Sequence, residues 1–145
     1  MSDLDGKVVW IIGGSGGIGS NLARRMSDNG WKVIISARNI ENLNLVSDGK
    51  PIDSLIVDAT NADDVQEKAK QINETYGSLD AVVNSVGSIF LRPLHATSSE
   101  QFMETINQNL VTSFNVIRAT AKIMMRGEWW PNCTFLICSS ISRYA

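Results

Sequence analysis

A glycine-rich turn near the N-terminus is the part of this chain whose residue types and spacing best suit chemistry. Residues 13–19 read Gly-Gly-Ser-Gly-Gly-Ile-Gly, after an apolar, β-branched run at 7–12 and before a helix-like pattern at 20–29. The first N–H groups of a helix have no partners inside it and carry the positive end of its dipole. Because glycines let the backbone come close to a pyrophosphate, the turn predicts a phosphate site. The alternative is a tight turn that needs glycine only for its backbone.

Small or polar residues follow the four other strand-like runs, which lie at 31–36, 54–57, 79–84 and 134–138. In chain order these residues are Arg38, Asp58, Ala59, the segment 84–87 (Asn-Ser-Val-Gly), Ser139 and Ser140. In open α/β sheets ligands bind where the carboxyl ends of the parallel strands meet. We therefore expect these residues to gather around the glycine turn.

Arg38 carries information about the ligand. A dinucleotide fold that selects NAD usually has an acidic residue after the second strand, whereas an arginine there suits the 2′-phosphate of NADP. The sequence has the arginine and lacks the acid, so we predict NADP(H) in preference to NAD(H). Asp58 could accept a hydrogen bond from the adenine amino group. The alternatives are a solvated surface arginine and an aspartate that only begins a helix.

Apolar strand-like runs alternate with helix-like segments along the whole chain, with helices expected at 20–29, 39–46, 61–76 and 97–126. The strands are apolar on both faces, as in a parallel sheet covered by helices on both sides. With right-handed crossovers, this pattern predicts an α/β fold with a doubly wound, Rossmann-type parallel sheet of five strands in the order 3-2-1-4-5. Residues 1–145 are expected to form one NAD(P)-binding domain.

Three helices support more detailed expectations. Asn61 should cap the helix at 61–76, with Val65, Ala69 and Ile72 facing inward. The pattern Thr97-Ser98-Ser99-Glu100 is typical of a capping box that starts the longest helix. The apolar stripe of that helix should pack on the core and consists of Phe102, Ile106, Leu110, Phe114, Ile117 and Ala121. In the first helix, one shared apolar face consists of Ile18, Leu22 and Met26.

Composition argues against several classes of function. The formal net charge of -2 provides no basic patch of the kind that nucleic acids require, and no apolar run approaches the ~20 residues of a membrane span. Cys133 and Cys138 lie too far apart along one strand for a disulfide, and they lack the histidine neighbours of a metal site. We therefore expect reduced cysteines and no metal. The N-terminus has no signal-peptide pattern, which favours a cytoplasmic location.

These motifs together resemble those of the short-chain dehydrogenase/reductase family. Its Thr-Gly-x-x-x-Gly-x-Gly motif is matched at 12–19 except that Ile12 replaces Thr, and its Asn-Asn-Ala-Gly motif is matched with two departures at 84–87. The resemblance implies two catalytic residues, Asn109 in the fourth helix and Ser140 after the fifth strand. The cofactor-binding residues that it and the strand ends indicate are Gly13, Ser15, Gly17, Ile18, Gly19, Arg38, Asp58, Ala59, Asn84, Val86 and Gly87.

The resemblance implies an oxidoreductase that acts on a small-molecule carbonyl/alcohol pair, with a serine that holds the substrate oxygen and an asparagine that positions a water. The family's Tyr-x-x-x-Lys motif, expected roughly a dozen residues beyond Ser140, does not occur before Ala145. We therefore expect a chain that ends early within the family's domain and is inactive alone. The alternative is a non-catalytic dinucleotide-binding module or an inactive fragment. Relatives commonly form dimers and tetramers, so a homo-oligomer is expected of the full-length form.

Overall fold

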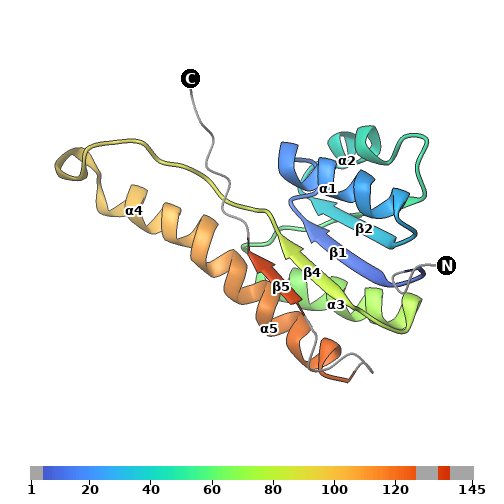
Figure 1. Cartoon of the computed structure of the whole chain (residues 1–145). Coiled ribbons are helices and arrows are strands. Elements are labelled where there is room, and N and C mark those ends of the chain that lie inside the picture. The colour runs from blue at the N-terminus through green and yellow to red at the C-terminus, as the bar shows by residue number, and fades with distance from the viewer. Residues whose placement is uncertain (1–4, 127–133, 138–145) are drawn as a thin grey trace.

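The strands form a parallel sheet in the order β3-β2-β1-β4-β5 (Figure 1). The computed structural model describes residues 5–126 and the backbone of 134–137. The strands are β1 (Val8–Ile12), β2 (Lys32–Ala37), β3 (Ile52–Ile56), β4 (Ala81–Asn84) and β5 (Thr134–Ile137). Every neighbouring pair runs parallel. The predicted parallel sheet with the strand order 3-2-1-4 is confirmed, and the backbone of β5 lies beside β4.

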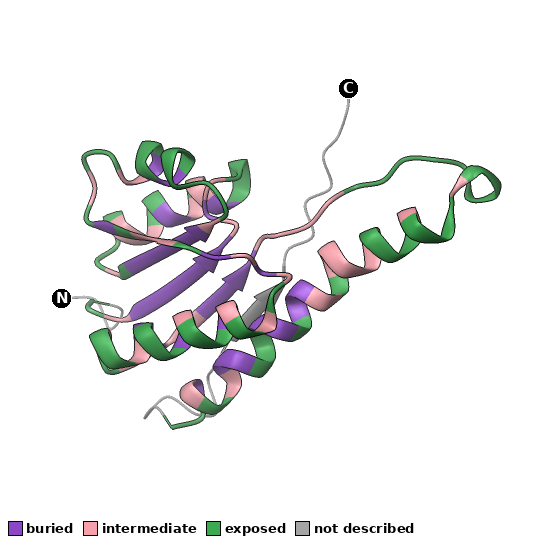
Figure 2. Cartoon of the chain, turned by 180° about the vertical axis from the view of Figure 1, so that it is seen from behind, coloured by how far each residue is buried: buried purple, intermediate pink, exposed green. Residues whose placement is uncertain are grey.

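Helices cover both faces of the sheet (Figures 1 and 2). α1 and α2 pack on one face, and α3 and α5 pack on the other. The bounds are α1 (Gly17–Asp28), α2 (Ile40–Ser47), α3 (Ala62–Tyr76), α4 (Ser99–Ile106) and α5 (Thr112–Met124), with a 3₁₀ turn at Leu94–Ala96 and a π-helical turn at Asn107–Val111. The α/β fold with helices on both faces is therefore the Rossmann-like arrangement that the sequence predicts.

Strand β1 lies at the centre of the sheet and is fully buried. Its side chains alternate between the two faces, as the period of a strand requires. Val8, Trp10 and Ile12 join the core under α3 and α5, whereas Val9 and Ile11 join the core under α1 and α2. This burial on both faces explains why the strand reads as a continuous apolar run.

Helix α3 matches its sequence pattern closely. The Asn61 side chain accepts hydrogen bonds from the backbone N–H groups of Asp63 and Asp64, which caps the helix N-terminus. Gly77 ends the helix in the left-handed conformation at φ 76°, and the predicted inward residues Val65, Ala69 and Ile72 are buried. The Asn61 cap and the inward face predicted for this helix are confirmed.

The predicted core stripe of the longest helix is wrong. Phe102, Leu110 and Phe114 are 53%, 62% and 59% exposed, and α4 extends beyond the sheet (Figure 2). The face of α5 that contacts the core instead carries the buried residues Thr112, Ser113, Asn115, Val116, Ala119, Thr120 and Met124. Periodicity identifies an apolar face but not the surface that it meets, and small polar residues let α5 approach the sheet and α3.

Two local expectations also need correction. The capping box lies one residue later than predicted. The Ser98 hydroxyl accepts from the Gln101 N–H, and the Gln101 side chain accepts from the Ser98 N–H. The Thr97 hydroxyl instead donates to the Pro93 carbonyl. Ile18 is 49% exposed and does not share the buried face of α1 with Leu22 and Met26. Its place in the first turn of the helix, at the edge of the sheet, puts it beyond the core.

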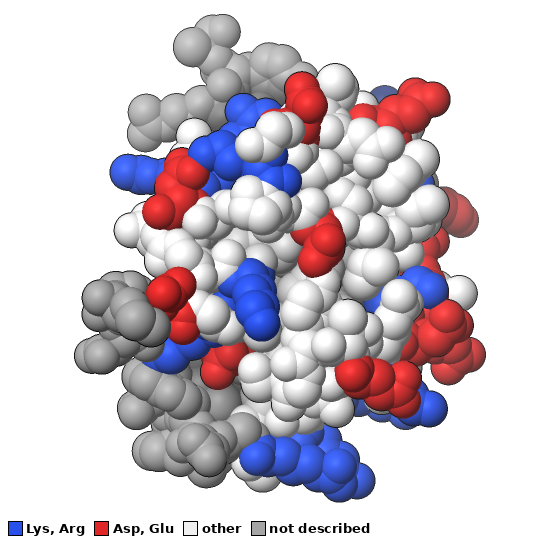
Figure 3. Space-filling model, turned by 90° about the vertical axis from the view of Figure 1, so that its right-hand side faces the viewer, with Lys and Arg blue, Asp and Glu red and all other residues white. Residues whose placement is uncertain are grey.

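Acidic and basic side chains are interspersed over the face shown in Figure 3, in keeping with the net charge of -2. Among the described residues, no helix is long and apolar enough to cross a membrane. Cys133, Cys138, Ser139 and Ser140 lie outside the described residues, so the expectations for them stay predictions.

Candidate functional site

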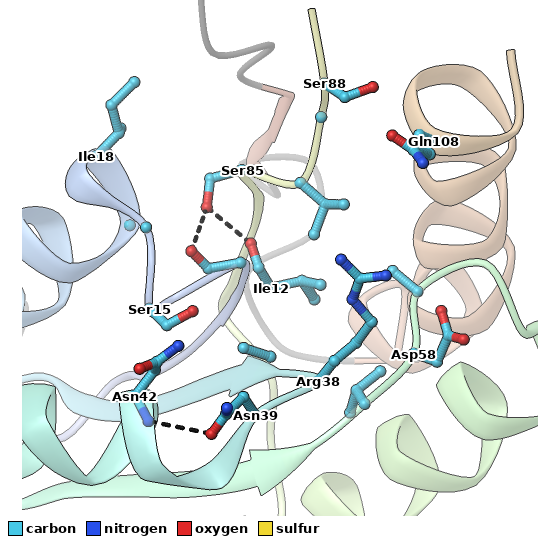
Figure 4. A pocket seen from close by; sticks show the side chains of 18 of the residues that line it. Ile12, Ser15, Ile18, Arg38, Asn39, Asn42, Asp58, Ser85, Ser88 and Gln108 are labelled. Carbon is cyan, nitrogen blue, oxygen red and sulfur yellow. Dashed lines mark hydrogen bonds between the residues drawn. The ribbon is translucent and has the colours of Figure 1, made fainter. Parts of the chain in front are cut away.

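A pocket of about 660 Å³ opens at the carboxyl ends of the strands, where the chain leaves β1, β2, β3 and β4 (Figure 4). It is lined by ten of the predicted residues, namely Gly13, Ser15, Gly17, Ile18, Gly19, Arg38, Asp58, Ala59, Val86 and Gly87. These residues come from the first turn of α1 and from the segments that follow β1, β2, β3 and β4, which the parallel sheet brings to one edge. Asn84 and Asn109 do not line the pocket, and Ser140 lies outside the described residues.

The glycine turn is held tightly against the neighbouring strands. Gly13 has φ +81°, and its N–H and that of Gly14 both donate to the Ser36 carbonyl, at 2.8 and 3.0 Å. A Cβ atom at Gly14 would lie 2.5 Å from Ile35 Cβ, and one at Gly19 would lie 2.5 Å from the Gly13 carbonyl oxygen. Glycine at these positions therefore lets the backbone segments pack together.

Ser85 fastens the turn to the end of β4. Its hydroxyl donates to the carbonyls of Ile12 and Gly13, at 2.8 and 3.1 Å, and its own N–H donates to the Ile12 carbonyl at 2.8 Å. Figure 4 shows the Ser85 side chain directed at the turn. Sequence reasoning did not assign Ser85 to the cofactor-binding residues, although it lies inside the 84–87 motif and its small hydroxyl side chain is typical of a tight turn.

The N-terminus of α1 faces the pocket and is open to a ligand. Gly16 precedes the helix without a side-chain cap, and a Cβ atom at Gly17 would meet nothing within 4 Å. The N–H groups of Gly17, Ile18 and Gly19 donate to no described residue. Unpaired N–H groups at the positive end of a helix form an anion site, so the structure fits the phosphates of a dinucleotide here.

Arg38 extends across the pocket toward Asp58 (Figure 4). It is exposed, and its guanidinium makes no hydrogen bond or ion pair with the described residues. Asn39 caps α2 by accepting from the Glu41 N–H at 2.8 Å, and Asn42 lies beside Ser15 in the same wall of the pocket. This end of the pocket therefore offers a cation and several neutral hydrogen-bonding groups to an anionic ligand.

Asp58 presents an ionised carboxylate to the pocket. Its Oδ1 accepts from the Thr60 hydroxyl at 2.7 Å and from the Thr60 N–H at 3.0 Å. These bonds lower the pKa of Asp58, and the positive charge of Arg38 lowers it further, against the opposing effect of partial burial. Its Oδ2 accepts from no described residue, which leaves one oxygen for a donor on a ligand.

Asn84 lies behind the pocket wall. It is 3% exposed, its amide donates to the Ser113 hydroxyl at 3.1 Å, and its Oδ1 accepts from the Val86 N–H at 3.1 Å. The second of these bonds shapes the turn that carries Val86 and Gly87 along the pocket. Asn84 therefore supports the pocket wall from behind.

Asn109 occupies the π-helical turn at Asn107–Val111. Its Oδ1 accepts from the Ser88 N–H at 3.1 Å, and its Nδ2 donates to the carbonyls of Ser88 and Thr105, at 3.1 and 2.8 Å. π-helical turns inside α-helices occur frequently at functional sites. Asn109 is partly buried, and its bonds to Ser88 connect the helix to the loop after β4.

Other residues line the pocket that the sequence did not single out, namely Asn39, Asn42, Thr60, Ser88 and Gln108. Asn42 and Gln108 reach it from helices, where a polar residue normally indicates only a solvated face.

Among the described residues, no group of histidine, cysteine, aspartate and glutamate is suited to hold a metal ion.

Comparisons with known proteins agree with this geometry. A sequence model described as short chain dehydrogenase matches residues 7–129. An uncharacterized oxidoreductase of Staphylococcus aureus strain MW2 is 29% identical over 128 residues, which cover 86% of this chain and 55% of the relative. An uncharacterized oxidoreductase of Staphylococcus epidermidis strain RP62A is 26% identical over 128 residues, which cover 87% of this chain and 56% of the relative. The chain thus spans about half the length of the curated relatives it matches.

Solved structures show the same arrangement of the backbone. A short-chain type dehydrogenase/reductase from Mycobacterium ulcerans matches 97% of this chain and 53% of its own, with a TM-score of 0.86 and 25% identity. An alcohol dehydrogenase from Thermococcus sibiricus, complexed with 5-hydroxy-NADP, matches 92% of this chain and 57% of its own, with a TM-score of 0.82 and 27% identity. A variant of actinorhodin polyketide ketoreductase with NADPH matches 85% of this chain and 49% of its own, with a TM-score of 0.77 and 25% identity.

Proposed function

The chain belongs to the short-chain dehydrogenase family, and on that premise we propose that it supplies the cofactor-binding part of an NADP(H)-dependent oxidoreductase acting on a carbonyl/alcohol pair. Members of the family bind nicotinamide dinucleotides and act on small molecules. The single observation that carries the choice of cofactor is Arg38, an exposed cation at the pocket that pairs with no described acid.

The residues of the pocket divide naturally between the parts of a dinucleotide. The uncapped N-terminus of α1, at Gly17 and Ile18, would bind the pyrophosphate, and Arg38 would pair with the 2′-phosphate. Asp58 would accept from the adenine amino group through its free oxygen, with Ala59 beside it. Val86 and Gly87 would form the floor under the middle of the dinucleotide.

The bound nicotinamide would exchange a hydride with the substrate carbon. By resemblance to the family, Ser140 would hold the substrate oxygen, and Asn109 would position a water that takes part in proton transfer. The contacts of Asn109 with Ser88 and Thr105 fix its side chain, so it would act from a held position. We further propose a homo-oligomer, because α4, α5 and the π-helical turn between them carry large exposed apolar side chains that include Phe102, Met103, Leu110 and Phe114.

Binding of NADP⁺ and NAD⁺ to the chain and to Arg38→Asp, measured by isothermal titration calorimetry, tests the choice of cofactor. We expect the unaltered chain to prefer NADP⁺, and Arg38→Asp to weaken NADP⁺ by about tenfold or more while NAD⁺ changes little, because a charge-assisted phosphate contact is lost and a repulsion is added. Arg25→Asp in the last turn of α1 is a matched control, since Arg25 is exposed and lies outside the pocket. An unchanged ratio of the two affinities in Arg38→Asp would refute the assignment.

A further inference from the structure

The inward face of α5 is unusually polar, and its buried polar side chains differ in what they bond. The hydroxyls of Thr112, Ser113 and Thr120 donate to carbonyls at Gln108, Asn109 and Val116, at 3.0, 2.9 and 2.7 Å. All three acceptors lie four residues earlier in the same helical segment. The Thr112 and Thr120 hydroxyls therefore bond only within their own helical segment, whereas the Ser113 hydroxyl also accepts from the Asn84 amide at 3.1 Å.

Asn115 behaves differently. It is 5% exposed, and its amide donates to the carbonyls of Ala59 and Thr60, at 3.0 and 3.2 Å. Both acceptors belong to the loop between β3 and α3, which is separated from Asn115 by more than 50 residues of sequence. A buried amide that joins two successive carbonyls of a distant loop fixes the orientation of those peptide groups.

The loop that Asn115 holds forms one wall of the pocket. Val57, Asp58, Ala59 and Thr60 all line the pocket. The Val57 N–H donates to the Ala37 carbonyl at 3.1 Å. After Val57 the other described anchors of the loop are local, since Asp58 N–H donates to Asp64 Oδ2 at 2.7 Å and Asn61 N–H donates to the Asp58 carbonyl at 3.0 Å. Asn115 is thus the one described side chain from outside β3 and α3 that bonds the carbonyls of Ala59 and Thr60.

We propose that Asn115 is a positioning residue for the adenine end of the dinucleotide site, acting through the peptide groups of Ala59 and Thr60. With both carbonyls turned toward α5, Asp58 keeps its carboxylate at the pocket and Ala59 keeps its place in the wall. Asn115 does not itself line the pocket, so its effect reaches the ligand only through the loop. This inference rests on the proposed dinucleotide site and adds a residue that determines how well the adenosine part is held.

Two variants and one control test the proposal. Asn115→Asp keeps the size of the side chain but places carboxylate oxygens against two carbonyls, and Asn115→Leu removes the amide donors. Thr120→Val is the matched control, because Thr120 is equally buried in α5 but bonds only its own helix. The probes are NADP⁺, 5′-AMP and nicotinamide mononucleotide, titrated by chemical shift, together with amide hydrogen exchange at Thr60 and Asn61 and the thermal midpoint of unfolding.

We expect both Asn115 variants to weaken 5′-AMP by about tenfold, to leave nicotinamide mononucleotide within about twofold, and to accelerate exchange at Thr60 and Asn61. Thr120→Val should lower the thermal midpoint and change neither affinity nor exchange in the loop. Equal losses for both probes, unchanged exchange in the loop, or the same loss of 5′-AMP in Thr120→Val would overturn the positioning role while leaving the dinucleotide site intact. Failure of the unaltered chain to bind NADP⁺ and 5′-AMP would instead refute the proposed function, and the role of Asn115 with it.

Discussion

The glycines of the turn at 13–19 fall into two groups according to what a methyl group would contact. At Gly14 a Cβ atom would lie 2.5 Å from Ile35, and at Gly19 it would lie 2.5 Å from the Gly13 carbonyl oxygen. The fold therefore requires glycine at these two positions. At Gly17 a Cβ atom would meet nothing within 4 Å, although the residue lines the pocket. Packing therefore does not require glycine at Gly17, and we propose that the space beside it is needed by a ligand.

This difference predicts opposite results for two alanine variants. Gly17→Ala should fold with unchanged or higher stability, by roughly 0.5–1 kcal/mol, because it begins α1 with ordinary helical backbone and alanine favours a helix. It should nevertheless weaken NADP⁺, because its methyl group enters the space that the phosphates would need. Gly14→Ala should lose stability, since its Cβ would overlap Ile35.

Urea denaturation and NADP⁺ titration on the same samples separate these effects. Gly16→Ala provides a control for stability alone, because a Cβ there would lie 3.4 Å from the Gly13 carbonyl, an ordinary contact distance, while Gly16 itself lines the pocket. Unchanged affinity in Gly17→Ala would show that the N-terminus of α1 does not contact the ligand closely.

At the scale of secondary-structure elements, α1 differs from the other helices that begin after a loop, whereas α5 continues the π-helical turn and has no free N-terminus. α1 has no side-chain cap, whereas Asn39 caps α2, Asn61 caps α3 and Ser98 caps α4. A missing cap leaves N–H groups unsatisfied, which is tolerated at a helix end where a ligand can bind them. The exception among the caps therefore coincides with the proposed phosphate site.

The cap of α3 permits a quantitative prediction. Asn61→Ala removes the acceptor for two N–H groups and should reduce the free energy of unfolding by about 1 kcal/mol, within a usual range of ~0.5–2. Asn73→Ala, in the last turns of the same helix, is the control and should cost nothing, because alanine is the better helix former there. Equal losses in the two variants, in urea titrations followed by circular dichroism, would rule out the capping contribution.

At the scale of the whole molecule, the described part of the chain leaves an apolar face exposed along α4, the π-helical turn and α5. Five large apolar side chains of this face are 36% to 62% exposed, namely those of Phe102, Met103, Leu110, Phe114 and Ile117. A shallow groove of about 330 Å³ lies along α4 and the π-helical turn, beside Met103, Ile106 and Val111. Large apolar patches of this kind mark interaction surfaces, which supports the proposed homo-oligomer.

Phe114→Glu should therefore shift the chain toward the monomer in sedimentation velocity at tens of micromolar. It should leave the thermal midpoint of the monomer nearly unchanged, since Phe114 is 59% exposed. Leu45→Glu on α2 is the control, because Leu45 is 71% exposed and lies on the opposite layer. A monomeric unaltered chain, or an equal effect of both variants, would contradict this interface.

The sequence by itself determined the alternation of elements, the parallel strand order 3-2-1-4 and the ten predicted residues that line the pocket. Strand period, turn glycines and helix caps are local properties, and the carboxyl ends of parallel strands must share one edge. Only the tertiary structure decided what each face meets. The apolar stripe of α4 and α5 lies outside, Asn84 and Asn109 stand behind or beside the pocket, and Asn115 reaches a loop more than 50 residues away. These outcomes depend on contacts between distant segments, which local periodicity does not encode.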